Sequence, residues 1–295
     1  MRRREITDGV YQRDFVGSFG KTVHRSLIRV VIIGMSLAGC ARDSSRSDVR
    51  QATVRIERID KEFDLASVVK RVAIDNPWGE INIRSRDERE IGIHAVIQHL
   101  PPKFANVEFN THREGDTLHI DVIVSGATAS SDRASAGARA DIAVYLPTNL
   151  ALKLSTRDSR IFATRRAAPI EATTDSGEIH ASSLGQLTLN SNTGQIRAMA
   201  IGKDWQGPSE IVTASGRIVL LVPTFGNVTL NADTGGALST GFGLSVHPQP
   251  NGGHEAHARY GAGTSSLRAH STSGEIVLEQ LVLLGDDKAL PEDDD

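Results

Sequence analysis

The chain has 295 residues, of which 39% are hydrophobic and 4% aromatic, and its 33 basic and 36 acidic side chains give a net charge of −3. This length and apolar content allow a sizeable core, and one elongated domain is expected rather than two globules. The charge balance offers no basic footprint for nucleic acid, and the single cysteine excludes an intramolecular disulfide.

The first residues of the chain have the pattern of an export signal. Seven basic residues between Arg2 and Arg29 precede an apolar run at residues 30–39. A run of this length is well short of the about 20 residues that a membrane-spanning helix needs. It suits the apolar core of a signal peptide.

The only cysteine follows this run directly, in Leu37-Ala38-Gly39-Cys40. These four residues resemble the lipobox of bacterial lipoproteins. The resemblance implies that residues 1–39 are removed and that Cys40 carries diacylglycerol on its sulfur, consistent with the nucleophilicity of a thiolate. With Ala41 next in the chain, it implies an envelope protein anchored in the outer membrane and facing the periplasm or the cell surface. The alternative is a short buried strand with an incidental cysteine.

The body of the protein is expected at residues 53–285. Residues 40–52 are polar and read as a flexible tether, which would reach about 20 Å. Residues 286–295 form an acidic tail, for which a solvated, disordered terminus is the simplest interpretation.

The N-terminal third of the body predicts an antiparallel sheet. Alternating apolar residues predict strands at 91–97, 107–109, 118–124 and 142–146, with His119 and Asp121 pointing outward. Residues 126–138 are nearly all Gly, Ala, Ser and Thr and predict a mobile loop. We expect this sheet to cap the open end of the C-terminal part of the body, because an uncovered edge recruits other strands.

A glycine marks the same place in a repeated strand–turn–strand unit. Around Gly177, the residues seven, five and three before it and two and four after it are small or aliphatic, and other units keep these offsets. The anchor glycines are Gly79, Gly177, Gly194, Gly216, Gly235 and Gly274, with Ser159 as a degenerate anchor. Period-two alternation at a near-constant interval predicts a β-solenoid.

Two details of the repeat lead to further expectations. The interval from Gly235 to Gly274 is about twice the others, so one rung near His254 is expected to have lost its turn signature. The anchor glycines are expected to supply positive φ angles. The Ser or Thr directly before each one is expected to bond the local backbone.

These motifs resemble a known family. Residues 76–83 (Asn-Pro-Trp-Gly-Glu-Ile-Asn-Ile), the repeated Ser/Thr-Gly turns and residues 234–242 are similar to the bacterial "putative adhesin" domain of unknown function. The resemblance covers residues 54–284. It implies an exported or membrane-tethered β-solenoid, and the family brings no catalytic residues.

Metal binding is the first chemical function that the sequence could support. His254-Glu255-Ala256-His257 places its imidazoles three apart, whereas a helical zinc protease site needs them four apart. On a strand, positions three apart face opposite ways. A calcium-binding repeat would place Asp at a fixed position in every unit, and only Asp175 and Asp233 stand two before an anchor. No metal and no cofactor are expected.

Carbohydrate cleavage is the second candidate. It requires two carboxylates on either side of the bond, about 5 to 10 Å apart. The column of residues just after the anchors alternates in charge, so it predicts ion pairs such as Arg160 with Glu178 rather than an acidic pair. No enzyme activity is expected from these residues.

Val219, Leu238 and Val277 lie three residues beyond their anchors, at positions expected to point outward. They are either covered by residues 242–263 or 280–284, or they form an exposed apolar patch for a partner.

The sequence thus predicts an all-β, non-enzymatic and lipid-anchored β-solenoid with an N-terminal antiparallel cap. Such a protein would act as an adhesin-like interaction module. Its partners would be the membrane, through the lipid, and an envelope protein or glycan, with no nucleic acid. A periplasmic sensory or regulatory domain is the alternative, and a carbohydrate-active β-helix enzyme is a third.

Overall fold

The computed structural model describes residues 53–65, 68–86, 90–127, 133–250 and 252–282. The expected signal peptide, Cys40, the tether and the acidic tail lie outside the described residues, as does part of the expected loop at 126–138.

The described chain is an all-β structure of two mixed sheets, as the sequence predicts. The ten-stranded sheet, here sheet A, has the order β1 (Arg55–Asp64), β4 (Glu90–His99), β7 (Ala138–Leu146), β3 (Ile81–Ser85), β9 (Ile161–Arg166), β11 (Ile179–Ser183), β13 (Ile196–Ala200), β15 (Ile218–Val222), β21 (Ile276–Gln280), β17 (Leu238–Thr240). The eleven-stranded sheet, here sheet B, has the order β18 (His247–Pro248), β19 (His254–Arg259), β16 (Val228–Thr234), β20 (Ser265–Ser271), β14 (Pro208–Thr213), β12 (Leu187–Ser191), β10 (Ile170–Thr174), β8 (Ala151–Ser155), β2 (Arg71–Asp75), β6 (Thr117–Val124), β5 (Val107–Glu114). One short helix, α1 (Arg133–Ala136), precedes β7.

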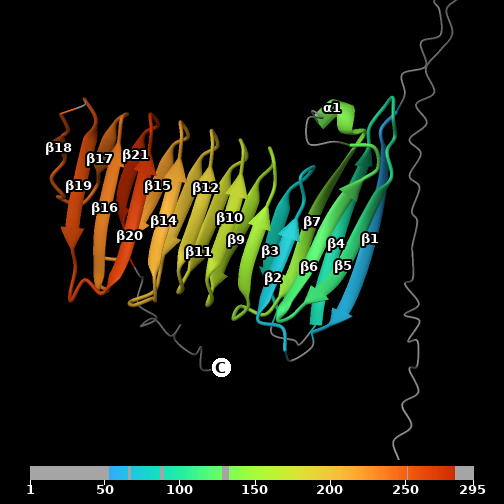
Figure 1. Ribbon diagram of the computed structural model, residues 1–295, viewed down its shortest axis with the longest axis horizontal. Coiled ribbons are helices and arrows are strands. Elements are labelled where there is room, and N and C mark those ends of the chain that lie inside the picture. Colours follow the sequence, from blue (N-terminus) through green and yellow to red (C-terminus); the bar gives the residue numbers. More distant parts are fainter. Residues whose placement is uncertain (1–52, 66–67, 87–89, 128–132, 251, 283–295) are drawn as a thin grey trace, which may run out of the picture.

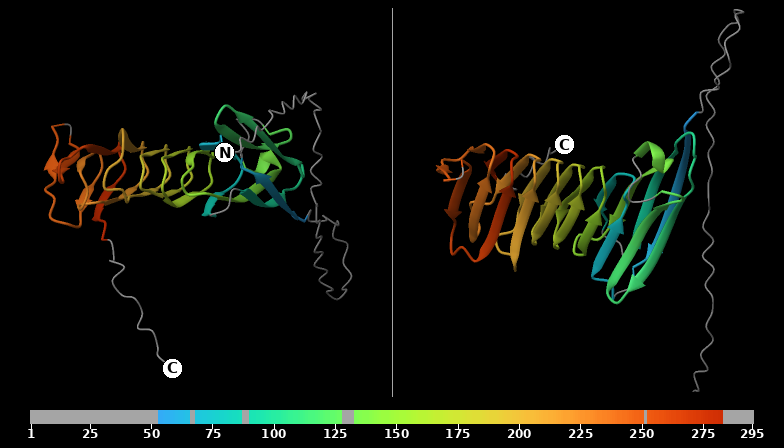
Figure 2. Two further views of the ribbon diagram at one scale, coloured as in Figure 1. Left: turned by 90° about the horizontal axis from the view of Figure 1, so that it is seen from below. Right: turned by 45° about the horizontal axis from the view of Figure 1, so that its top comes forward.

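Between β8 and β15 the chain alternates between the two sheets, and within each sheet these strands pair in parallel. The register joins equivalent positions of successive repeats, such as Ile170 with Leu187 and Ile179 with Ile196. The inward residues of both sheets form one continuous buried cluster. Figures 1 and 2 show the two sheets face to face along the length of the body.

The C-terminal strands are not stacked in chain order. β20 pairs with β14 on one side and β16 on the other, and β21 likewise lies between β15 and β17 (Figure 1). The repeat of Gly274 is therefore inserted between those of Gly216 and Gly235. The expectation of a degenerate rung near His254 is wrong, because the residues that lengthen this interval include β19, an antiparallel strand on β16.

The N-terminal repeat is also displaced from chain order. β2 and β3 pair with β8 and β9, which places the repeat of Gly79 directly beside that of Ser159. The intervening residues add strands beyond it: β4 is antiparallel to β1 and β7, and β5 to β6. The four strands predicted from the sequence fall within β4, β5, β6 and β7, whereas β1 was not predicted.

The anchor glycines are required by close packing and not by a special backbone angle. None of the six has a positive φ, so that part of the sequence interpretation is wrong. A Cβ atom on Gly194 would lie 1.8 Å from the carbonyl oxygen of Gly177, and one on Gly216 would lie 2.0 Å from that of Gly194. Each anchor glycine thus stacks on the backbone of a neighbouring strand or turn, which for Gly177, Gly194, Gly216 and Gly274 is the turn of the neighbouring repeat. In the last repeat Leu238 pairs with Ile276, so Gly236 rather than Gly235 matches Gly274.

A buried hydroxyl reinforces each of these turns. The glycine N–H donates to the side-chain oxygen of the residue three before it: Thr174 for Gly177 (3.0 Å), Ser191 for Gly194 (2.9 Å), Thr213 for Gly216 (2.9 Å) and Ser271 for Gly274 (2.8 Å). The Thr174 hydroxyl in turn donates to the carbonyl of Arg157 in the neighbouring repeat (3.0 Å). The predicted bond from the hydroxyl directly before an anchor is found at Thr234, which accepts from the Gly236 N–H (2.9 Å), and Ser273 donates to the carbonyl of Ala214 in a neighbouring repeat (3.3 Å).

Gly194→Ala is expected to destabilise the protein by about 1–3 kcal/mol, because the added methyl forces the stacked backbones apart. Ser159→Ala at the degenerate anchor adds no atom between the stacked backbones and should cost much less. The free energy of unfolding from chemical denaturation measures both. Equal and negligible losses at the two sites would contradict the stacking argument.

Thr174→Val should cost about 1–3 kcal/mol, since it leaves the buried N–H of Gly177 without its acceptor and removes the hydroxyl bond to the neighbouring repeat. Thr173→Val is the matched control: it makes the same change one residue earlier, on the exposed side of the same strand. A loss of the same size for both variants would show that the hydroxyl bonds contribute nothing specific.

Candidate functional site

The outer side of sheet B is the candidate contact surface, and we name it the polar face. It consists of the outward-pointing strand residues, because the alternating residues on the other side are buried in the core. On the central strands it carries Thr173, Thr188 and Asn190, which neighbour one another through the parallel register. Parallel pairing repeats such side chains at about 4.8 Å from strand to strand.

Charged groups on the polar face are largely paired across strands. Lys153 Nζ lies 3.0 Å from Glu171 Oε1. On the C-terminal strands, Asp233 receives His270 Nδ1 at 2.5 Å and Arg268 Nη2 at 3.7 Å. The insertion of β20 beside β16 is what brings these two residues to Asp233.

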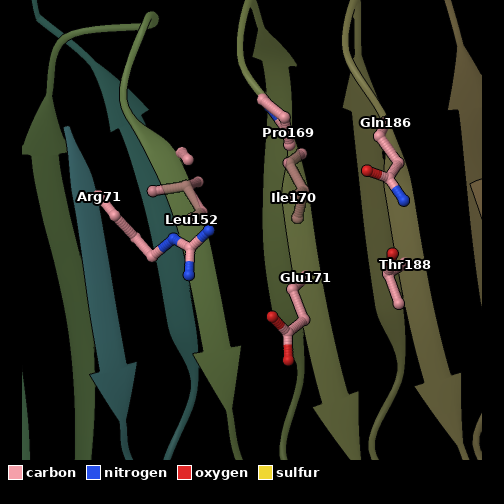
Figure 3. Close-up of a pocket in the computed structure, with 8 residues that line it drawn as sticks. Arg71, Leu152, Pro169, Ile170, Glu171, Gln186 and Thr188 are labelled. Atoms are coloured by element: carbon pink, nitrogen blue, oxygen red, sulfur yellow. The ribbon is translucent and has the colours of Figure 1, made fainter. Parts of the chain in front are cut away.

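One shallow pocket of about 100 Å³ lies on the polar face (Figure 3). Arg71 lies on one side of it, Glu171 near its centre, and Gln186 and Thr188 on the other side (Figure 3). It is lined by Arg71, Ala151, Leu152, Pro169, Ile170, Glu171, Gln186 and Thr188. A pocket that binds a drug-sized ligand usually holds about 300–1,000 Å³, so this one fits at most a single small group of a larger ligand.

Sheet A carries the expected ladder after the anchors. Arg160 Nε lies 3.4 Å from Glu178 Oε2, which confirms the predicted ion pair. His180 also contacts Glu178, at 2.6 Å. Arg217 pairs with Glu275 at 3.0 Å, a contact that exists because β21 is inserted beside β15. In this ladder Glu178 and Glu275 each meet a basic group.

The two histidines of the His254-Glu255-Ala256-His257 motif face opposite sides of β19, as expected of a strand. His254 Nδ1 meets the carbonyl of Gly236 at 2.8 Å, whereas His257 is exposed and bonds Asn231 Oδ1 at 2.9 Å. Ala256 between them is buried in the core. Within the part of the chain that the structure describes, no three His, Cys, Asp or Glu side chains are grouped so that they could hold a metal ion.

The three apolar positions expected to point outward do not form an exposed patch. Val219 is 3% exposed, and Leu238 and Val277 are half-buried. Leu238 is in register with the inward Ile276, so its predicted orientation was wrong. Phe242 and Leu244 of the loop after β17 pack against the core.

One buried cation has a structural role. The Arg166 side chain is 1% exposed, and its guanidinium donates to the carbonyls of Leu146 (3.4 Å) and Pro147. Burial lowers the pKa of Arg166 to about 10. It holds the end of β9 to the end of β7 and faces no surface at which a ligand could bind.

Two carboxylates meet on neighbouring strands at the N-terminal end of the polar face. Asp75 on β2 is in register with Asp121 on β6. Desolvation raises the pKa of Asp75; a hydrogen bond from Ser155 opposes this rise and the charge of Asp121 adds to it. Asp121 in turn lies 3.6 Å from His112, whose ring stacks on that of His119 at 4.7 Å.

Sequence reasoning placed the outward row Thr188, Asn190, Thr229 and Asn231 on one face, and the structure confirms this. Two strands, β14 and β20, separate the two halves of the row. Sequence reasoning missed the contacts of His112 with Asp121 and of His270 with Asp233. The one sequence feature that pointed to the first of these contacts was the alternation that places His119 and Asp121 on the outward side of their strand.

No family model matches the sequence, and no curated protein is significantly similar to it. Among solved structures, the chain is similar to a protein from Clostridium sporogenes described as a "putative cell adhesion protein", at 12% identity and a TM-score of 0.49, covering 77% of this chain and 100% of that one. A second is a "putative adhesin" from Bacteroides fragilis, at 10% identity and a TM-score of 0.30, covering 76% and 97%. Among the described residues, no helix is long and apolar enough to cross a membrane.

Asp75→Asn is expected to raise the unfolding temperature at neutral pH. A raised pKa means that the carboxyl favours the folded state only while it is protonated, and that this contribution is lost as the pH rises through the folded-state pKa. The gain should therefore vanish in acid, below the carboxyl's ordinary pKa. Asp75 is exposed, so solvent screens its interactions and the gain in unfolding temperature is expected to be small.

Asp121→Asn provides the control for this effect. It removes the neighbouring charge, so the double variant should gain less than the sum of the two single variants. A strictly additive double variant, or a pH-independent gain from Asp75→Asn, would contradict the coupling of the two carboxylates.

Proposed function

We propose that the protein is a non-enzymatic, lipid-anchored β-solenoid of the bacterial cell envelope that acts by binding, as an adhesin-like interaction module. Residues 1–39 would be the lipoprotein signal peptide, Cys40 the lipidated residue, 40–52 the tether and 53–285 the binding body. The observation that carries the proposal is the polar face, whose outward side chains repeat across the strands of one extended sheet.

The build of this face suits an extended partner. Its side chains stand on a hydrogen-bonded ladder, so binding loses little conformational entropy. The shallow pocket on this face can take a single group of a larger molecule, and the flanking rows offer hydroxyl, amide and charged groups in register. An envelope protein or a glycan chain lying along the strands fits this arrangement.

The ends of the body support a stable scaffold for such contacts. In the proposed solenoid the antiparallel strands β1, β4 and β5 cap the N-terminal end, where Phe63 and Phe109 pack against the core. At the other end β17 has three residues and β18 two, which leaves little edge for further pairing.

Replacing Thr188, Asn190, Thr229 and Asn231 together by Ala is expected to reduce recovery of a partner when the protein is co-purified from detergent-solubilised envelopes. Thr164→Ala with Ser239→Ala on sheet A is the matched control and should leave recovery unchanged. Equal recovery from both variants would exclude the polar face. Cleavage of a polysaccharide by the purified protein, abolished by changing one carboxylate, would replace the proposal by an enzyme.

Cys40→Ser is expected to leave the chain unprocessed or released from the membrane, because the lipid acceptor is gone. Membrane fractionation and metabolic labelling with a radioactive fatty acid measure this. A variant that still fractionates with membranes as a shortened, lipid-labelled species would show that Cys40 is not the anchor.

A further inference from the structure

The histidines of this protein are paired with acids to an unusual degree. Of the nine histidines that the structure describes, seven lie within 4 Å of a carboxylate. Four of these seven are on the polar face: His112, His119, His257 and His270. A fifth histidine of this face, His247, is in register with Glu255. Imidazole is the side chain that changes charge between about pH 5 and 8.

The N-terminal end of the polar face, on β5, β6 and β2, is acidic. Its outward strand residues include four carboxylates, on Glu108, Glu114, Asp121 and Asp75, and one cation, Arg71, which leaves three negative charges. His112 faces Asp121 and the ring of His119. His119 faces Glu114, and across β2 it faces Ala73. Protonation of both imidazoles would leave one negative charge at this end.

The C-terminal end, on β20, β16, β19 and β18, is balanced when its histidines are neutral. Asp233 and Glu255 offset Arg268 and Arg259. His270 faces Asp233 on one side and Val212 on β14 on the other. His257 faces Glu255 and Asn231, and Glu255 also accepts a bond from Gln249. Protonation of the three histidines at this end, His247, His257 and His270, would leave three positive charges here.

Protonation of histidines changes the net charge of the middle of the polar face little. Lys153, Glu171 and Glu210 on β8, β10 and β14 leave one negative charge, and the uncharged Thr188 and Asn190 lie between. With neutral histidines the N-terminal end therefore carries three negative charges, and the C-terminal end has no net charge. With protonated histidines they carry one negative and three positive charges, so that the ends become opposite in sign.

We propose that the polar face binds a second copy of this chain face to face in mildly acid conditions, with the N-terminal end of each copy against the C-terminal end of the other. A copy rotated by half a turn supplies this charge pattern reversed, and a two-fold interface is self-complementary. In neutral conditions one end is uncharged and the attraction is lost. A polyanion would be attracted only to the positively charged C-terminal end. This inference rests on the proposed binding role of the face and names its partner and its control by protons.

Sedimentation velocity of the full chain carrying Cys40→Ser, at about pH 5.5 and about pH 7.5 on either side of the imidazole range, tests the proposal. We expect a dimer in acid and a monomer in neutral buffer, with the dimer weakened as salt rises from about 0.05 to 0.5 M. A monomer at both values, or a dimer of equal strength at both, overturns it. If the monomer still captures an envelope component, the binding role stands and only self-association fails.

Histidine variants test whether the histidines of the polar face control the dimer. Changing the three histidines of the C-terminal end, His247, His257 and His270, to Gln leaves that end uncharged in acid and should raise the dimer Kd there by about tenfold, as expected from several ion pairs of modest strength. The control changes the three paired histidines of sheet A, His94, His99 and His180, to Gln and should keep the dimer. A loss of the dimer in the control, or its retention in the first variant, contradicts the assignment to the polar face.

Charge reversal tests the orientation. R259E with R268E makes the C-terminal end negative, and E108K with E114K makes the N-terminal end positive. Each variant alone should stay monomeric in acid, because its two ends then carry like charges. An equal mixture should form a dimer, because both contacts between unlike chains join opposite charges. A mixture that stays monomeric while the unchanged chain dimerises would exclude this orientation.

Discussion

The stacking of the repeats depends on the close approach of a glycine in one repeat to a backbone carbonyl in the neighbouring repeat. The space for a Cβ atom at Gly177, Gly194, Gly216 and Gly274 is already occupied by backbone of the neighbouring repeat, so the repeats can approach to strand-pairing distance at their turns only because side chains are absent there. Both sheets depend on this, since each turn joins a strand of sheet B to a strand of sheet A. The hydroxyl of Thr174, Ser191, Thr213 or Ser271 then satisfies an N–H that the close approach hides from water.

This constraint explains which parts of the fold could be predicted. The glycine and the alternating residues around it are local features, so the repeats, their strands and their inward residues could be identified from the sequence alone. The order of stacking is a different matter. The inward residues of β14, β20 and β16 pair as Ile211, Ala269 and Ala232, and the three strands share the same alternation of inward and outward residues. No local feature decides that β20 inserts between the other two.

Pairs of side chains were predictable only where both partners lie in the sequential repeats. Arg160 and Glu178 belong to consecutive repeats, and their pairing follows from chain order. The partners of Asp233, by contrast, come from a strand more than thirty residues further along the chain. β1 was missed for another reason: its charged residues alternate with few apolar ones, so its signal is weak until its antiparallel pairing with β4 is seen.

The distribution of charge pairs shows the same division between the repeats and the ends. In the repeats, acids are paired mainly with Arg or Lys, as in Lys153 with Glu171 and Arg217 with Glu275, and such pairs keep their charge across the physiological range. On the strands added outside the sequential stack, histidine takes this place, as in His94 with Asp60 on β4 and β1, or His270 with Asp233. On the polar face, the histidines therefore lie at the two ends, and the stacked middle strands β8, β10, β12 and β14 carry none. The strands of the sheet keep their positions when the charge of these histidines changes, because the distance between strands is set by backbone hydrogen bonds and not by the ion pairs. Proton control of this protein would consequently be a change in the charge of its surface and not a change in its fold.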